Sequence, residues 1–136
     1  MKILVCGGTG LLGTYLSNFF SKKKYSVVRA GFKKKGDVKI NLCDFEDTRK
    51  KIAKIKPNII INCAAYTNVD DCNKNFLAAI NGNIISIYNI FLAIKKINLK
   101  STLYHFLLII IIINMEANII IKNIYIIILI KYIKKY

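Results

Sequence analysis

The chain has 136 residues and a formal net charge of +15, from 22 Lys and Arg residues against 7 Asp and Glu residues. This length suits one domain and excludes two of ordinary size. Only Arg29 and Arg49 are arginines, and Arg rather than Lys makes the bidentate contacts of phosphate and base recognition. The positive charge therefore does not indicate a nucleic-acid partner.

The cysteines show no spacing typical of a zinc site. No pair has the Cys-x-x-Cys spacing, and the single histidine, His105, is far along the chain from all of them: Cys6, Cys43, Cys63 and Cys72. Glycine-rich sequence follows Val5 directly, which does not fit a secretory signal. We therefore expect no metal site, reduced thiols and a cytoplasmic location.

The first predicted elements are a strand, a helix and two further strands. Residues 2–6 form a short apolar run bounded by glycines, which predicts a buried strand. Residues 11–24 are predicted to be a helix, because apolar residues recur at spacings of three and four: Leu12, Tyr15, Leu16, Phe19 and Phe20. Residues 26–30 and 38–42 are predicted as strands, with Gly31 ending the first of them.

The next elements alternate in the same way. A helix is predicted from an N-cap at Asp44 to about Ile55, where Pro57 disfavours helical geometry in the residue before it. A strand over residues 58–62 and a helix over residues 75–97 follow, and residues 106–113 are a candidate fifth strand. Apolar strands that alternate with helices predict an α/β fold of the Rossmann type, a parallel sheet with helices on both faces.

The segment of residues 7–13 is a candidate phosphate-binding loop. It satisfies both G-x-G-x-x-G, through Gly8, Gly10 and Gly13, and G-x-x-G-x-x-G, through Gly7, Gly10 and Gly13. Between a first strand and a first helix, such glycines allow a tight turn and a close approach of a pyrophosphate to the helix N-terminus. The alternative is a glycine-rich turn without a ligand. In this context we predict nucleotide binding.

The end of the second strand carries cationic residues where an acidic residue would bind the ribose of NAD. Arg29 stands there, Lys33, Lys34 and Lys35 follow, and the first acid is Asp37. A cationic strand end suits the 2′-phosphate of NADP, so NADP is favoured slightly over NAD. The alternative is that the three lysines form a solvated loop.

The stretch Pro57-Asn-Ile-Ile-Ile-Asn-Cys-Ala-Ala-Tyr-Thr-Asn-Val-Asp-Asp-Cys72 resembles the dTDP-4-dehydrorhamnose reductases, which are extended short-chain dehydrogenases. That family has a Pro-Asp-hydrophobic run, then Asn-Ala-Ala-Ala-Tyr-Thr, then Val-Asp. The resemblance covers about residues 1–100, roughly the first third of a family member. It implies NAD(P)H-dependent reduction of a nucleotide sugar for surface polysaccharide, with dTDP-4-dehydrorhamnose as the family's substrate.

The resemblance also implies cofactor contacts in three groups. The pyrophosphate would contact Gly10, Leu11 and Leu12. The adenine would contact Asn41 and Leu42, and the nicotinamide-ribose would contact Cys63, Ala64 and Ala65. Asn81 matches an asparagine of a family helix. Asn41 departs from a common Asp, and Cys63 replaces an Ala. Without the flanking match, residues 63–65 would be interpreted as packing at a strand end.

No catalytic residue is predicted for this chain. The family resembles other short-chain dehydrogenases, in which a Tyr is the general acid and a Lys four residues later lowers the pKa of that Tyr. No tyrosine here has a lysine at that spacing. We therefore expect no reductase activity from this chain. The alternatives are a non-catalytic NAD(P)-binding regulatory module, or a relative of another sugar-nucleotide reductase or epimerase. A homodimer is kept as a candidate assembly.

The C-terminal residues differ in composition from the rest. The family's next strand should continue with Ser-Thr-Asp-Tyr after the match that ends at Phe106, but this chain has Leu107-Leu-Ile-Ile110. Codons for Ser-Thr-Asp-Tyr read one base later begin Leu-Leu-Ile. We therefore interpret residues 1–106 as a partial NAD(P)-binding domain and residues 107–136 as an irregular, Ile-rich, out-of-frame tail. The alternative, a selected membrane anchor, is disfavoured because neither apolar run reaches about 20 residues.

Overall fold

The structure is a computed structural model that describes residues 1–33, 36–67, 74–109 and 124–128. The elements in chain order are β1 Lys2–Cys6, α1 Leu11–Lys22, β2 Ser26–Gly31, β3 Val38–Lys39, α2 Phe45–Ile55, β4 Ile59–Asn62, α4 Phe76–Ile80, the π-helix η1 Asn81–Ile85, α5 Ser86–Lys96, β5 Thr102–Ile109 and β6 Ile124–Ile128.

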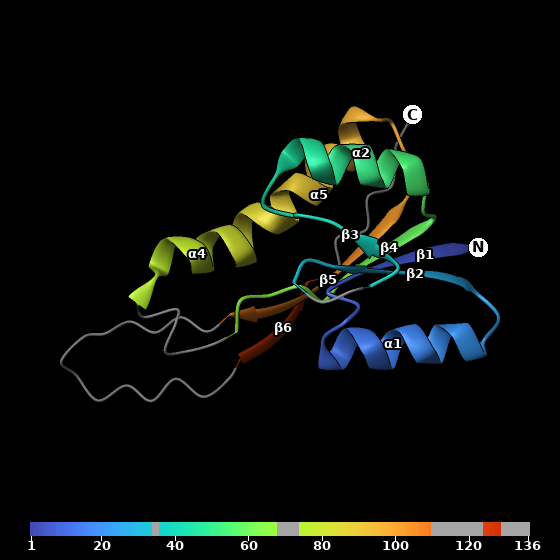
Figure 1. The fold of residues 1–136 in the computed structure, drawn as a ribbon, viewed down its shortest axis with the longest axis horizontal. Helices are drawn as coiled ribbons and strands as arrows, with labels where there is room; N and C mark the ends of the chain where they lie inside the picture. The colour runs from blue at the N-terminus through green and yellow to red at the C-terminus, as the bar shows by residue number, and fades with distance from the viewer. Residues whose placement is uncertain (34–35, 68–73, 110–123, 129–136) are drawn as a thin grey trace.

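The strands form one sheet in the order β3-β2-β1-β4-β5-β6. The first five strands are parallel, and β6 pairs with β5 in the antiparallel direction. Helix α1 covers one face of the sheet, while α2 and α5 pack together on the other (Figure 1). The prediction of a Rossmann-type parallel sheet with helices on both faces is confirmed.

The two faces of the sheet are set by the alternation of side chains along the strands. In β1, Leu4 and Cys6 face α2 and α5, whereas Ile3 and Val5 face α1, and all four are fully buried. Because both faces of β1 are covered, its residues are apolar throughout, as the sequence pattern predicts. This central strand carries the glycine loop at its carboxyl end.

Three element boundaries differ by two or more residues from the sequence predictions. The candidate fifth strand over residues 106–113 begins earlier, as β5 Thr102–Ile109. Helix α1 ends at Lys22, because Lys24 adopts a left-handed φ of 62°. Strand β3 ends at Lys39 instead of residue 42. The N–H of Ile40 still donates to the carbonyl of Gly31 at 3.1 Å, and side chains replace the strand pairing after it. The N–H of Asn41 donates to Asp47 Oδ2 at 2.7 Å, and the N–H of Cys43 donates to Asn41 Oδ1 at 3.2 Å.

The predicted helix over residues 75–97 is a continuous run of three segments, α4, η1 and α5. A π-helical turn occupies its centre, which the apolar spacing does not predict. Within the described residues, Phe76–Lys96 is the one helix long and apolar enough to cross a membrane. Core helices of soluble proteins share that property, and α5 buries Ile90, Ala93 and Ile94 against the sheet.

Two further predictions concern the apolar face of α1 and the C-terminal residues 107–136. Of the apolar residues expected on one face of α1, Leu16 and Phe20 pack on the sheet, but Leu12, Tyr15 and Phe19 are exposed. In the C-terminal residues, expected to be irregular, the described part contains β6. The rest of that tail, together with Lys34, Lys35 and the Val-Asp of the resemblance, lies outside the described residues.

Candidate functional site

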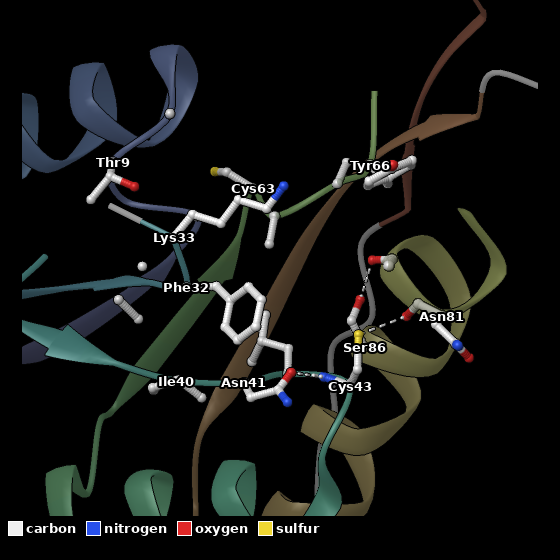
Figure 2. Close-up of a pocket in the computed structure, with 18 of the residues that line it drawn as sticks. Thr9, Phe32, Lys33, Ile40, Asn41, Cys43, Cys63, Tyr66, Asn81 and Ser86 are labelled. Carbon is white, nitrogen blue, oxygen red and sulfur yellow. Dashed lines mark hydrogen bonds between the residues drawn. The ribbon is translucent and has the colours of Figure 1, made fainter. Parts of the chain in front are cut away.

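A cavity of about 550 Å³ lies at the carboxyl ends of the parallel strands. The chain leaves β1 toward β2 and β3 and later returns to β4 on the other side of β1, so this is the point where the strand order reverses. Ligands of open α/β sheets bind at such a point. The loops after β1, β2, β3 and β4, together with α4, η1 and the start of α5, line the cavity (Figure 2).

The glycine loop forms the first wall. Gly7 has a φ of 70°, and its carbonyl oxygen accepts the N–H of Gly10 at 3.0 Å. A Cβ on Gly13 would lie 2.2 Å from that same oxygen, so this position tolerates no side chain. Gly10 is the N-cap of α1 and has no side-chain cap, which leaves the N–H groups of the first turn available to an anion.

The segment after β3 forms the second wall. Asn41, Leu42 and Cys43 line the cavity in the turn that leads to α2. Buried Asn89 of α5 donates to the carbonyl of Leu42 at 2.9 Å, and Asp44 caps α2 by accepting the N–H of Asp47 at 3.0 Å. These bonds fix the turn that follows the last backbone bond to β2, from the N–H of Ile40 to the carbonyl of Gly31.

The segment after β4, residues 63–66, forms the third wall. The side chain of Asn62 lies behind it: Asn62 Oδ1 accepts the N–H of Ala64 at 3.0 Å, and its Nδ2 donates to Nδ1 of His105 at 3.1 Å. This arrangement puts the proton of the neutral imidazole on Nε2, which is buried and has no hydrogen-bond partner among the described residues. Burial lowers the pKa of His105.

The thiols around the cavity are not activated. Burial raises the pKa of Cys63 to about 11, and burial together with the neighbouring Cys63 raises the pKa of Cys6 to about 12. Burial also raises the pKa of Cys43, whose Sγ donates to the carbonyl of Asn81 at 3.4 Å. All three thiols are therefore protonated at neutral pH and are poor nucleophiles.

Arg29 lies outside the cavity lining. Its Nη2 is 2.9 Å from Asp37 Oδ1, and both side chains are nearly half exposed. The hydrogen bond from Arg29 lowers the pKa of Asp37. Phe32 and Lys33, which directly follow β2, line the cavity instead. Lys39 Nζ lies 5.7 Å from the centroid of the Phe32 ring.

The structure brings most of the expected cofactor residues around the one cavity. Those that line it are Gly7, Gly10, Asn41, Leu42, Cys63, Ala64 and Ala65, with Asn81 of the resemblance. Those outside its lining are Leu11, Leu12, Gly13 and Arg29.

Sequence reasoning did not single out Phe32 or Tyr66, which also line the cavity. The position of Phe32 directly after the last residue of a strand is a signal that could have identified it.

The family model for the RmlD substrate binding domain matches residues 1–104. A hypothetical dTDP-4-dehydrorhamnose reductase from Sulfolobus tokodaii is similar in structure, with 32% identity and a TM-score of 0.69 over 77% of this chain and 38% of that chain. The dTDP-4-dehydrorhamnose reductase of Bacillus anthracis in complex with NADP has 27% identity and a TM-score of 0.63 over 75% of this chain and 34% of its own.

Methionine adenosyltransferase 2 subunit beta of Danio rerio is 31% identical over 85 residues, which are 61% of this chain and 26% of that protein. The chain thus spans between about a quarter and two fifths of the length of these relatives.

Proposed function

Because the chain belongs to the RmlD substrate binding domain family, whose model matches residues 1–104, we propose that its cavity binds a nicotinamide dinucleotide. One observation carries the proposal: the cavity lies at the switch point of the sheet, beside a glycine loop in which Gly13 leaves no room for a Cβ. A turn without a ligand has no need of such a cavity. The relative from Bacillus anthracis was solved with NADP.

The cofactor would span the three walls. Its pyrophosphate would lie at Gly10, beside the N–H groups of Leu11 and Leu12 at the start of α1. The adenine would lie near Phe32 and the turn of residues 41–42, and the nicotinamide-ribose near residues 63–65. When bound, the cofactor supplies a hydride. The chain's own residues would bind and orient the cofactor. The small side chains of Ala64 and Ala65 would let the nicotinamide-ribose approach the wall after β4 closely.

NADP is favoured over NAD because Lys33 lines the cavity beside Phe32. An ammonium group there would pair with a 2′-phosphate, whereas Arg29 is already paired with Asp37. Replacement of Lys33 by Ala should lower the ratio of NADPH to NADH affinity about tenfold, the size of one charge-assisted contact. Arg29→Ala is the matched control and should leave the ratio unchanged. Equal affinities of the unmodified protein for the two cofactors would contradict the preference.

Fluorescence titration with NADPH tests binding itself. The unmodified protein should bind saturably, and Gly13→Ala should abolish binding, because the new methyl group would collide with the carbonyl of Gly7. A Cβ on Gly10 would meet that carbonyl oxygen at 3.3 Å, a contact that needs only a small shift. Gly10→Ala should therefore keep the fold, checked by circular dichroism, and weaken binding. An unmodified protein without saturable binding would refute the proposal.

At the level of the family, the proposed activity is reduction of a dTDP-linked keto sugar with NAD(P)H. For this chain we infer cofactor binding without turnover, because no tyrosine in the sequence has a lysine four residues later. Incubation of the purified chain with dTDP-4-dehydrorhamnose and NADPH should leave the absorbance of NADPH constant. Consumption of both compounds in a one-to-one ratio would overturn this inference.

A second candidate is a non-catalytic module that regulates another enzyme. The observation that favours it is the similarity to a protein named as a subunit of methionine adenosyltransferase 2. This candidate predicts that the chain forms a defined complex with a partner enzyme and changes its kinetics. Co-purification followed by an assay of the partner with and without the chain would test it.

The division of the chain at Phe106 and the out-of-frame origin of residues 107–136 also stay proposals. Sequencing of the locus tests both. A shifted reading frame should restore Ser-Thr-Asp-Tyr after Phe106, and a frame that does not restore it would refute the frameshift.

A further inference from the structure

Asn83 of η1 makes two hydrogen bonds to the backbone of one cavity residue, Tyr66. The N–H of Tyr66 donates to Asn83 Oδ1 at 2.7 Å, and Asn83 Nδ2 donates to the carbonyl oxygen of Tyr66 at 3.1 Å. A planar amide side chain thus pairs with the backbone as a neighbouring strand would. The contact joins residues 17 positions apart and connects the wall after β4 to the π-helical turn.

The residues around Asn83 fit this contact. A Cβ on Gly82 would lie 3.0 Å from Cβ of Tyr66, so a side chain there would push the two segments apart. Ser86 Oγ donates to the carbonyl of Gly82 at 2.6 Å and holds the wide turn. A π-helical turn adds a residue to a helix and shifts the direction of the side chains that follow, which is why such turns are frequent at functional sites.

The contact also fixes the separation between two sides of the cavity, the wall after β4 and the π-helix η1. Tyr66 and Asn81 line it (Figure 2). Gly82 lines it as well, whereas Asn83 itself does not. The other end of the wall is held at Ala64 by the side chain of Asn62. The backbone of residues 63–66 is therefore held at both ends by asparagine side chains, one from β4 and one from η1.

We propose that Asn83 is a positioning residue for the cofactor: it holds the wall of residues 63–66 against η1, at the separation that admits the nicotinamide-ribose half. It acts through the backbone of Tyr66 and does not contact the ligand. This inference rests on the proposed function, since it assigns to Asn83 the geometry of that same cavity. An amide side chain offers its acceptor and its donor side by side in one plane, which matches the N–H and the carbonyl oxygen of Tyr66.

Titration with two ligands tests the inference. NADPH reaches the wall of residues 63–66, whereas 2′,5′-ADP, which carries only the adenine half, does not. Asn83→Ala should raise the Kd of NADPH about tenfold and leave the Kd of 2′,5′-ADP within twofold of that of the unmodified protein. Asn83→Asp keeps the acceptor for the N–H of Tyr66 and should restore part of the NADPH affinity.

Asn58→Ala is the matched control. Asn58 Oδ1 accepts the N–H of Lys2 at 2.7 Å, at the opposite end of the strands, and this variant should change neither Kd. The inference would be overturned if Asn83→Ala raised the Kd of NADPH and the Kd of 2′,5′-ADP by the same factor. It would also be overturned if the variant left the Kd of NADPH unchanged.

Hydrogen exchange without any ligand separates the inference from the proposed function. The amide of Tyr66 should exchange slowly in the unmodified protein and at least tenfold faster in Asn83→Ala, while the amides of β1 keep their protection. Unchanged exchange at Tyr66 would overturn the positioning role even if NADPH binds. If the amide responds as expected and the unmodified protein binds no NADPH, the proposed function fails and the role in cofactor positioning fails with it.

Discussion

The two faces of the sheet differ in how completely they are covered. On the face under α2 and α5, Leu4, Ile60 and Leu103 are at most 1% exposed, and the cluster extends without interruption from β2 to β5. On the face under α1, the fully packed residues are concentrated at β1, and Tyr104 and Phe106 of β5 are only partly buried. Within the described residues, the core under α2 and α5 is therefore the larger of the two, and the core under α1 is the smaller.

The candidate site uses both layers, because the glycine loop leads into α1 on one face and other lining residues come from the opposite face. Asn81, Gly82 and Ser86, which line the cavity, come from the helical run on the face of α2 and α5. The site can therefore form from the described residues, although these cover a minority of the length of related proteins. Stability should therefore depend mainly on the face of α2 and α5, whereas cofactor binding should depend on residues from both faces.

The largest expected effect comes from neighbouring residues of β4 that face opposite layers. Ile60→Ala should lower the free energy of unfolding by about 2–5 kcal/mol, because the deleted side chain leaves a cavity in a closed core. Ile59→Ala, on the partly covered face, should cost about 1 kcal/mol, because less area returns to water. Urea denaturation of both variants checks the comparison. Equal losses would show that the two faces are equally packed in solution.

A second, smaller effect should depend on pH. His105 lies on the same face as Ile60, and burial lowers its pKa below the ordinary value of 6.5. The unfolded chain then binds the proton more readily than the folded one. The imidazole's contribution to stability is complete above pH 6.5 and is lost as the pH falls toward the lowered folded pKa.

Comparison with His105→Phe isolates that contribution. The stability of the unmodified protein relative to the variant should fall as the pH is lowered from about 7.5 to about 5. Urea midpoints measured across this interval test it. A difference that does not change with pH would mean that the imidazole is not desolvated on this face.

The smallest effect is expected at the exposed ion pair. Arg29→Ala should leave the urea midpoint unchanged within error, because Arg29 and Asp37 are both nearly half exposed and water screens their attraction. High salt should likewise have no effect on the difference. A clear loss of stability would show that the end of β2 is packed more tightly than the exposed fractions of these side chains indicate.

Local patterns were sufficient to predict the parallel sheet, and the family resemblance named several residues that line the cavity. Apolar strands alternating with an amphipathic α2 determine the parallel topology, and parallel strands bring their carboxyl ends, with Gly7, Asn41 and Ala64, to one edge. Asn41, which the resemblance assigns to the adenine side, lines the cavity, and its role there stays a prediction. The early end of β3 was missed because the side chain of Asp47, six residues later, takes the N–H that a strand partner would use.

The remaining differences come from contacts between distant residues. The charge of Arg29 predicts an anionic partner but does not say whether that partner is a phosphate or a carboxylate. In the structure it is Asp37, because the loop after β2 brings this residue back beside Arg29. The spacing over residues 75–97 fits an uninterrupted α-helix equally well. The π-helical turn lies where Gly82 and Asn83 meet Tyr66, a neighbour in space that no helical periodicity reveals.

The two edges of the sheet have opposite consequences for self-association. At one edge, β3 has two residues and carries the charge of Lys39, features that discourage another strand from adding there. At the other edge, β6 has five residues, Ile-Tyr-Ile-Ile-Ile, with neither charge nor proline. Within the described residues such a strand favours further pairing, so aggregation is expected to begin at the β6 edge rather than at the β3 edge.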